Sequence, residues 1–404
     1  DRALSIKRKI ELGFALEEQL LDDPRFVGAT KAQLKKAIKD QVDDFIHYSY
    51  TDFFYDDYVD LGEELSKILP MMGKKKVFYG NSGAESIEAA MKVSRWHSGR
   101  QGYIAYIGSF HGRTMGAVSL TASKPYQRRK FSPLIPGVEH IFYPYCYRCP
   151  FNLECPSCDY ACVDYIDDYL FHKYVAPEEV AMLIAEPIQG EGGYVMPPDG
   201  YFKKLKKLLD EYGILFAVDE VQSGVGRTGK WWAIEHFGVE PDLLCTAKGI
   251  AAGLPLGVMA SKAEIQDWTP GSHASTFGGN PVSCAAALAV LDIIKTDNLL
   301  DNATEQGGYI KKRLEEMKET HPMIGDVRGI GLMVGVEIVK DKDSKEVAPK
   351  ATEDVMMECF RNGLAIVNCG VNIIRWMPPL TITRDLIEPS LEIFEKALSK
   401  VEAS

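Results

Sequence analysis

The sequence has no long uninterrupted run of apolar side chains and no excess of positive charge. A membrane-spanning helix needs about 20 apolar residues in succession, and no stretch of the chain approaches that length, which argues against a membrane protein. The 46 lysines and arginines are outnumbered by 57 aspartates and glutamates, so the formal net charge is -11. This acidic balance argues against nucleic acids or anionic membranes as general partners. We therefore expect small-molecule partners, with no nucleic acid and no membrane.

The first residues, DRALSIKRKIELGF, also lack the apolar core and small-residue cleavage site of a secretory signal. We therefore expect a cytoplasmic protein, although the chain begins at Asp1 without a methionine and a targeting segment removed ahead of it stays open. Neither an internal repeat nor a low-complexity linker interrupts the sequence. The composition, with 46% hydrophobic and 25% charged residues, is typical of a globular protein, and 404 residues favour two domains.

Cysteine is sparse outside one short window. That window holds Cys146, Cys149, Cys155, Cys158 and Cys162, while Cys245, Cys284, Cys359 and Cys369 are scattered. Its two Cys-x-x-Cys pairs offer four thiolates to zinc or an iron–sulfur cluster, but only five residues separate the pairs, fewer than in a usual zinc ribbon. Disulfides or free thiols in a surface insertion are together favoured over a metal site, and no metal ligand is assigned.

Short apolar runs alternate with amphipathic stretches between residues 46 and 295. The runs expected to form strands are residues 77–80, 103–109, 180–187, 214–221, 242–249 and 257–261, and helical spacing is found at residues 84–98 and 201–213. This alternation predicts a layered α/β domain with a largely parallel sheet.

The pattern changes after residue 296. It then predicts a charged helix at 305–321, strands at 331–340, 364–370 and 372–382, and a closing helix at 385–402. Helical spacing also occurs at residues 4–21 and 32–46. We therefore expect a large domain at 46–295 and a smaller α+β domain made of residues 1–45 and 296–404.

Two chemically important residues stand where strands are expected to end. Lys248 lies between an apolar run and a glycine-rich loop, and Asp219 closes the apolar run before it. Partial desolvation at such a position favours the neutral amine, which can attack a carbonyl. Pyridoxal phosphate is the cofactor that most often uses a Schiff-base lysine, and its ring nitrogen needs a carboxylate partner. The two residues therefore predict Lys248 as the cofactor's anchor and Asp219 as the partner of its ring nitrogen.

Two turns are candidates for binding a phosphate. Residues 81–85 (NSGAE) follow an expected strand and open a helix, where free backbone N–H groups bind anions. Residues 276–281 (TFGGNP) offer a hydroxyl and unhindered amides. Either motif alone also fits an ordinary helix cap or turn.

Further motifs suggest groups that hold a ring and a carboxylate. Phe110, in FHG, is suited to stack on a flat heteroaromatic ring, although an isolated FHG is more often a core phenylalanine beside a satisfied His111. Arg375 is suited to a bidentate pair with a substrate carboxylate, and Glu191 to neutralising it in the absence of one. Each of these two residues would otherwise be half of a structural ion pair.

A competing motif is G-x-G-x-x-G at residues 224–229, which follows a strand and raises the alternative of a nicotinamide dehydrogenase. Asp219, Glu220 and Gln222 occupy the strand end where the tight phosphate turn would be needed. We therefore interpret this motif as a loop beside the site.

Taken together, these motifs resemble the class III aminotransferases, the fold-type I pyridoxal phosphate family that includes 4-aminobutyrate, ornithine and acetylornithine aminotransferases. The ordered motifs are NSGAE, FHGRT, EPIQGEGG, DEVQSGVGRTG, AKG, STFGGNP and RWMPPLTI, and the resemblance runs from residue 47 to the C-terminus. It implies a large domain with a mostly parallel seven-stranded sheet flanked by helices, plus a smaller α+β domain.

The resemblance also implies roles for individual residues. The cofactor-binding residues would be Ser82, Gly83 and Ala84 at the phosphate, Phe110 and Val221 on the ring faces, His111 beside them, Asp219 at the ring nitrogen, Gln222 at the ring hydroxyl and Lys248 as the Schiff base. Thr276 would reach the partner subunit's phosphate in a homodimer with shared active sites. Arg375 would bind the substrate carboxylate, with Glu191 as its switchable partner.

The function implied is transfer of an amino group between an amino acid and a 2-oxo acid such as 2-oxoglutarate or pyruvate, by a ping-pong mechanism. An amino-acid racemase or epimerase of the same family and a non-catalytic binding protein stay open as alternatives. Two features depart from the family. Residues 1–30 show neither the DGN turn nor the G-H-x-H-P segment that form a wall of the substrate pocket, and the window 146–162 is an insertion.

Overall fold

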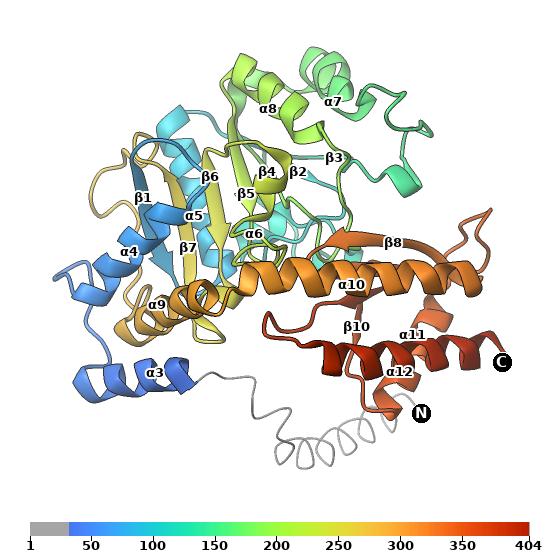
Figure 1. Ribbon diagram of the computed structural model, residues 1–404. Helices are drawn as coiled ribbons and strands as arrows, with labels where there is room; N and C mark the ends of the chain where they lie inside the picture. Colours follow the sequence, from blue (N-terminus) through green and yellow to red (C-terminus); the bar gives the residue numbers. More distant parts are fainter. Residues whose placement is uncertain (1–31, 404) are drawn as a thin grey trace.

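The computed structural model describes residues 32–403. Two sheets, each with its own helices, lie along the chain in order (Figure 1). The expected helix at 4–21 and residues 1–30, which show no DGN turn and no G-H-x-H-P segment, lie outside the described part of the chain.

The larger sheet has seven strands. They are β1 (Lys75–Gly80), β2 (Gly102–Tyr106), β3 (Val138–Ile141), β4 (Val180–Ala185), β5 (Leu215–Asp219), β6 (Leu243–Thr246) and β7 (Gly257–Lys262), in the order β1-β7-β6-β5-β4-β2-β3. β7 runs antiparallel to both of its neighbours, and the other pairings are parallel. The prediction of a mostly parallel seven-stranded sheet is therefore confirmed.

Helices cover both faces of this sheet. They are α4 (Asp56–Ile68), α5 (Gly83–Ser98), α6 (Met115–Leu120), α7 (Ala161–Tyr165), α8 (Tyr201–Tyr212) and α9 (Pro281–Thr296), with a π-helical stretch at Ile166–Tyr174. All six residues of β4 are buried, with Met182 and Ile184 in the core beneath α5 and Leu183 and Ala185 in the core beneath α8. Burial on both faces explains why this strand reads as a continuous apolar run.

The smaller domain is built on a four-stranded antiparallel sheet. Its elements are α10 (Leu299–Thr320), β8 (Ile324–Ile330), β9 (Met333–Ile338), α11 (Pro349–Arg361), β10 (Val367–Cys369), β11 (Ile373–Trp376) and α12 (Arg384–Glu402), with the strand order β10-β11-β9-β8. Figure 1 shows α10 and α12 side by side, and Ile310 and Phe394 from these helices share one core with Trp376. β3, β8 and α11 are elements that the sequence patterns did not predict.

The N-terminal helix α3 (Ala32–Asp44) packs against α9, and its Leu34 belongs to the core of the larger domain. The expectation grouped residues 1–45 with the smaller domain, so the described part of that segment lies elsewhere. Three of the helix's apolar positions, Leu34, Ile38 and Val42, recur every four residues, which gives α3 one face to bury. Within residues 32–403, no helix is both long enough and apolar enough to cross a membrane.

Candidate active site

A cavity of about 340 Å³ lies beyond the carboxyl ends of the central parallel strands, where open α/β sheets bind ligands. It is lined by Asn81, Ser82, Gly83, Ala84, Phe110, His111, Gly112, Glu186, Glu191, Asp219, Val221, Gln222, Ala247, Lys248 and residues 253–256. Ten of the twelve predicted site residues line it; Thr276 and Arg375 do not.

One end of the cavity is the N-terminus of α5. Ser82 caps this helix, and its hydroxyl accepts a hydrogen bond from Glu85 N at 3.3 Å. The first N–H groups of a helix have no acceptor within the helix, so they are available to an anion. β7 begins against this turn, because a Cβ on Gly257 would lie 2.0 Å from Ser82 O and only glycine permits that approach. The geometry suits the phosphate site predicted at residues 82–84.

The floor of the cavity carries a buried acid and imidazole. Asp219 Oδ2 lies 2.8 Å from His111 Nδ1, and Asp219 Oδ1 accepts a hydrogen bond from Val221 N at 3.0 Å. Asp219 is 4% exposed and His111 is 3% exposed. His111 Nε2 is buried and has no hydrogen-bond partner among the described residues. The contacts orient the carboxylate that we expected to face a ring nitrogen.

Glu186 is a second buried carboxylate at the cavity. Its oxygens accept hydrogen bonds from Phe110 N and Gly190 N, both at 3.0 Å. Burial raises the pKa of Glu186 to about 7, against a smaller opposing effect of His111. Glu186 directly follows β4, and the sequence carries no sign of this pKa shift, because burial by distant segments causes it.

Lys248 also lines the cavity, just beyond the end of β6. It has a left-handed backbone with φ of 47° and starts a short 3₁₀ turn, Lys248–Ala251. Such a conformation is uncommon for a residue other than glycine and is often retained at functional sites. The side chain is exposed in the single chain, so the desolvation expected from the sequence is not observed.

The residues expected around a ring are brought to the same cavity. Phe110, Val221 and Gln222 all line it and are partly buried. Val221 packs against the start of α5, where a Cβ on Gly83 would lie 3.0 Å from its methyl groups. Gln222 lies against Gly190, which has no side chain to obstruct it.

The two domains meet at an ion pair beside the cavity. Arg375 Nη1, from β11, donates a hydrogen bond to Glu191 Oε1 at 3.1 Å, and Gly370 N donates to Glu191 O at 2.8 Å. Lys124 Nζ lies 3.2 Å from the other oxygen, Glu191 Oε2. The sequence predicted the pairing of Arg375 with Glu191 but missed Lys124, because a lysine in a polar turn carries no signal of its distant partner.

Thr276 lies apart from this cavity. It is exposed on the loop that precedes α9, next to Phe277, which is 62% exposed. The position leaves the residue accessible from outside the subunit. Its expected role across a dimer stays a prediction.

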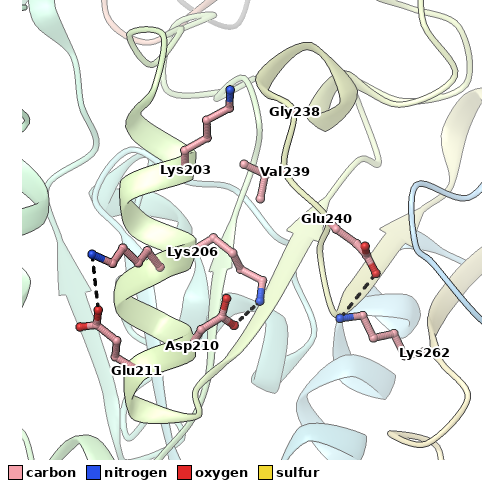
Figure 2. A pocket seen from close by; sticks show the side chains of 9 residues that line it. Lys203, Lys206, Asp210, Glu211, Gly238, Val239, Glu240 and Lys262 are labelled. Atoms are coloured by element: carbon pink, nitrogen blue, oxygen red, sulfur yellow. Dashed lines mark hydrogen bonds and ion pairs between the residues drawn. The ribbon is translucent and has the colours of Figure 1, made fainter.

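A larger hollow of about 740 Å³ lies on the outer side of α8 (Figure 2). Charged side chains line it, and they pair with one another: Lys206 with Asp210, and Lys262 with Glu240 at 3.6 Å. None of the predicted site residues lies there. The hollow is therefore a salt-bridged surface, and the chemistry belongs to the cavity at the strand ends.

The cysteine window forms an irregular segment at the edge of the larger domain. All nine cysteines are free thiols, and Cys155 contacts both Cys146 and Cys158. Burial raises the pKa of Cys146 to about 11 and that of Cys162 to about 12. Within residues 32–403, no group of three or more potential ligands is placed to hold a metal ion.

The donor set of the cavity fits pyridoxal phosphate. It combines an anion site at the start of α5, a carboxylate held in place by His111 at Asp219, and the amine of Lys248. His111 Nε2 is buried without a hydrogen-bond partner among the described residues, and the cavity of about 340 Å³ between these donors has room for a flat group. A phosphorylated ring with a basic nitrogen and a carbonyl requires these three kinds of partner.

Comparisons with known proteins agree with this choice of cofactor. The family description Aminotransferase class-III matches residues 24–398. A leucine/methionine racemase from Thermococcus litoralis is 44% identical over 377 residues, covering 93% of this chain and 84% of the relative. A probable 4-aminobutyrate aminotransferase from Bacillus subtilis is 39% identical, covering 92% of this chain and 86% of the relative.

The fold has close solved counterparts. The amine transaminase from an uncultivated Pseudomonas species, solved in its PLP-bound form, superposes with a TM-score of 0.85 at 31% identity, covering 92% of this chain and 87% of that one. The architecture is that of the fold-type I enzymes, as expected. The chain belongs to the class III aminotransferases, a family of pyridoxal phosphate-dependent enzymes.

Proposed function

We propose that this enzyme transfers an amino group from an ω-amino or α-amino acid to a 2-oxo acid such as 2-oxoglutarate or pyruvate, in two half-reactions at one site. The observation that carries the proposal is the ion pair between Arg375 and Glu191 at 3.1 Å. A ping-pong enzyme must accept two different substrates in turn. An arginine whose counter-ion can be exchanged gives one pocket two states, one with and one without an available cation.

Different residues of the cavity are assigned to binding the cofactor and to transferring the proton. Pyridoxal phosphate supplies a carbonyl that condenses with amines and a ring that accepts the electron pair left at the substrate Cα. Lys248 removes the proton from that Cα and later returns a proton. Asp219, held by His111, would keep the ring nitrogen protonated. Ser82, Gly83 and Ala84 hold the phosphate, because their amides stand at the N-terminus of α5.

The remaining residues position the ring and select the substrate. Gln222 would bind the ring hydroxyl, and Phe110 and Val221 would pack on the ring, because all three line the cavity. With Glu191 closed on Arg375, the pocket is suited to the apolar chain of an ω-amine. With the pair open, Arg375 binds the carboxylate of an α-amino acid or a 2-oxo acid.

The shared site of a homodimer belongs to the same proposal. Thr276 is exposed and lies outside its own subunit's cavity, which is the placement that a residue reaching the partner's phosphate needs. Its neighbour Phe277 leaves apolar surface open to a second copy.

Racemisation is the second candidate, and the relatives favour it. Besides the Thermococcus racemase, an alanine/serine racemase from Pyrococcus horikoshii is 43% identical over 378 residues. Both reactions begin with removal of the Cα proton, and they differ in whether a proton returns to Cα from the opposite face. The cavity therefore accommodates either outcome.

One experiment separates the candidates. The holoenzyme is incubated with a single enantiomer of leucine, first alone and then with 2-oxoglutarate or pyruvate, or with a single enantiomer of alanine, first alone and then with 2-oxoglutarate. Amino transfer predicts a new amino acid and a new oxo acid only in the second incubation. Interconversion of enantiomers in the first, without net transfer in the second, would instead establish a racemase. A bound cofactor whose visible absorbance no amino donor discharges would leave only a binding protein.

The donor screen should include 4-aminobutyrate, ornithine, β-alanine, lysine and aliphatic α-amino acids. Transfer from an ω-amine tests the closed state of the Glu191–Arg375 pair, and transfer from an α-amine tests its open state. The ratio of the kcat/KM values for these two kinds of transfer then reports the balance between the closed and the open state of the pocket.

A further inference from the structure

Glu191 is held by two cations that come from different domains. Arg375, on β11 of the smaller domain, contacts Oε1, and Lys124, from the larger domain, contacts Oε2 at 3.2 Å. The side chains of Lys124, Glu191 and Arg375 are 20%, 25% and 17% exposed. Solvent screens these three charges only partly, so a change in the ion-pair partner of Glu191 or Arg375 changes the electrostatic free energy.

The turn that carries Lys124 is rigid. Lys124 O accepts a hydrogen bond from Gln127 N at 3.1 Å, and Pro125 follows it directly. Ser123 Oγ donates to Gln127 Oε1 at 2.6 Å, and Gln127 is buried. The lysine therefore approaches Glu191 from a fixed base. Its own backbone does not have to move if Glu191 changes partner.

The net charge of Lys124, Glu191 and Arg375 favours the binding of one more anion. One carboxylate between two cations leaves one positive charge in excess. If Arg375 takes the carboxylate of a substrate, Glu191 still has Lys124, and the four groups form two balanced pairs. Without Lys124, the same binding event would leave Glu191 as an unpaired and partly buried carboxylate, which is costly.

We propose that Lys124 is the positioning residue that retains Glu191 when Arg375 is released to bind a substrate carboxylate. The inference rests on the proposed function of Arg375. Lys124 thereby lowers the cost of opening the Glu191–Arg375 pair and favours substrates that carry an α-carboxylate. In this exchange of ion pairs, Glu191 keeps Lys124 as its partner throughout.

The test is a double-mutant cycle on ligand binding by the holoenzyme. The probe is 4-methylpentanoate, an unreactive carboxylate with the carbon chain of leucine, and its Kd is measured by calorimetric titration. Lys124→Gln is expected to raise this Kd about tenfold, within the usual range of coupling between sites. Lys124→Arg, which preserves the charge, should restore binding to within about threefold, a difference below 1 kcal/mol.

The same substitution in a Glu191→Gln background decides the mechanism. There Arg375 has no charged partner to release, so Lys124→Gln should change the Kd by at most about twofold. Equal weakening in both backgrounds would overturn the proposal, because Lys124 would then contact the ligand itself or act through the fold. An unchanged Kd in the native background would overturn it as well. Arg375→Gln should abolish binding, and its failure to do so would remove the basis of the inference.

Failure of the proposed function gives a different result. If the enzyme transfers no amino group but the cycle shows coupling between Lys124 and Glu191, the aminotransferase assignment is wrong and the ion-pair exchange stands. Unfolding midpoints of all variants separate a loss of binding from a loss of fold.

Discussion

At the scale of single residues, three carboxylates of one cavity are given different properties by their surroundings. Asp219 is oriented by His111 and Val221 N, Glu191 lies between two cations, and Glu186 is buried beside backbone donors. Burial raises the pKa of Glu186 to about 7, because the surroundings of an acid, more than its residue type, set its pKa. The sequence predicted Asp219 and Glu191 at the site because each follows an apolar strand. It did not predict the state of Glu186.

Glu186 should make stability depend on pH. Its pKa is raised from 4.5 to about 7, so the folded protein holds this proton longer than the unfolded chain does. The contribution to stability is therefore full below pH 4.5 and is lost as the pH rises toward 7. We expect Glu186→Gln to flatten the fall in unfolding midpoint between pH 5 and 8, measured by thermal denaturation.

A matched control for this prediction is Glu178→Gln, because Glu178 is exposed on the surface. It should reproduce the pH profile of the native protein. A Glu186→Gln variant with the same profile would show that Glu186 does not titrate in this range.

Lys248 is predicted to be indispensable. Lys248→Ala removes both the amine that anchors the cofactor and the base at Cα, so turnover should fall by about 10³-fold or more. Borohydride reduction followed by mass spectrometry should find the cofactor attached to the native protein and not to the variant. Lys203→Ala, on the exposed side of α8, is the control and should keep full activity. Native turnover by Lys248→Ala would refute the assignment.

At the scale of elements, the site depends on how closely segments approach one another. Gly257 lets β7 begin against the cap of α5, and Gly307 lets α10 pack against residue 331. A glycine motif in the sequence indicates such places without saying which neighbour is close. The predicted strands β4, β5 and β6 were recognisable because they are buried on both faces.

The elements that sequence patterns missed have weaker signals. β3 is a four-residue edge strand, of which only Ile141 is buried. β8, IGDVRGI, contains two glycines and two charged residues, and Arg328 is accommodated there because Glu337 of the adjacent strand and Asp326 pair with it, both at 2.7 Å. Partners that lie far away along the chain stabilise such elements, and local patterning does not record them.

Two adjacent glycines of α10 should respond in opposite ways to alanine. A Cβ on Gly308 meets nothing within 4 Å, so Gly308→Ala should stabilise the protein by about 0.5–1 kcal/mol through helix propensity. A Cβ on Gly307 would lie 2.0 Å from Gly331 O, so Gly307→Ala should destabilise by about 1–3 kcal/mol. Denaturant unfolding of the pair measures both values. Equal effects of the two substitutions would show that α10 does not pack as described.

At the scale of the whole molecule, the cysteine-rich segment connects the two domains. Arg148 Nε, from this segment, lies 2.5 Å from Glu337 Oε1 of β9, and Tyr145 also donates to Glu337. Burial would raise the pKa of Glu337, but Arg328, Tyr145 and Arg148 together hold it below its usual value. The insertion therefore contacts the same small sheet that carries Arg375.

If the two subunits of a homodimer share their active sites, mixed dimers of two inactive variants should regain activity. Lys248→Ala and Thr276→Asp should each inactivate the enzyme, the second because an acid repels the phosphate. Random reassociation gives half mixed dimers, each with one intact site, so mixing should restore about a quarter of native activity. Differently tagged subunits, separated after mixing, allow the measurement on the mixed dimer alone. If each subunit uses its own Thr276, the mixed dimer stays inactive.

The sequence alone determined the layered α/β fold, the cofactor and ten of the residues that line the cavity, because strand ends, glycine turns and buried runs are local features and the ordered motifs resemble one family. Only the tertiary structure decided that burial raises the pKa of Glu186 to about 7, that Lys248 is exposed in the single chain and that Lys124 shares Glu191 with Arg375. These properties arise between groups far apart in the chain. Burial and ion pairing depend on which distant segments the fold brings together, and no local pattern contains that information.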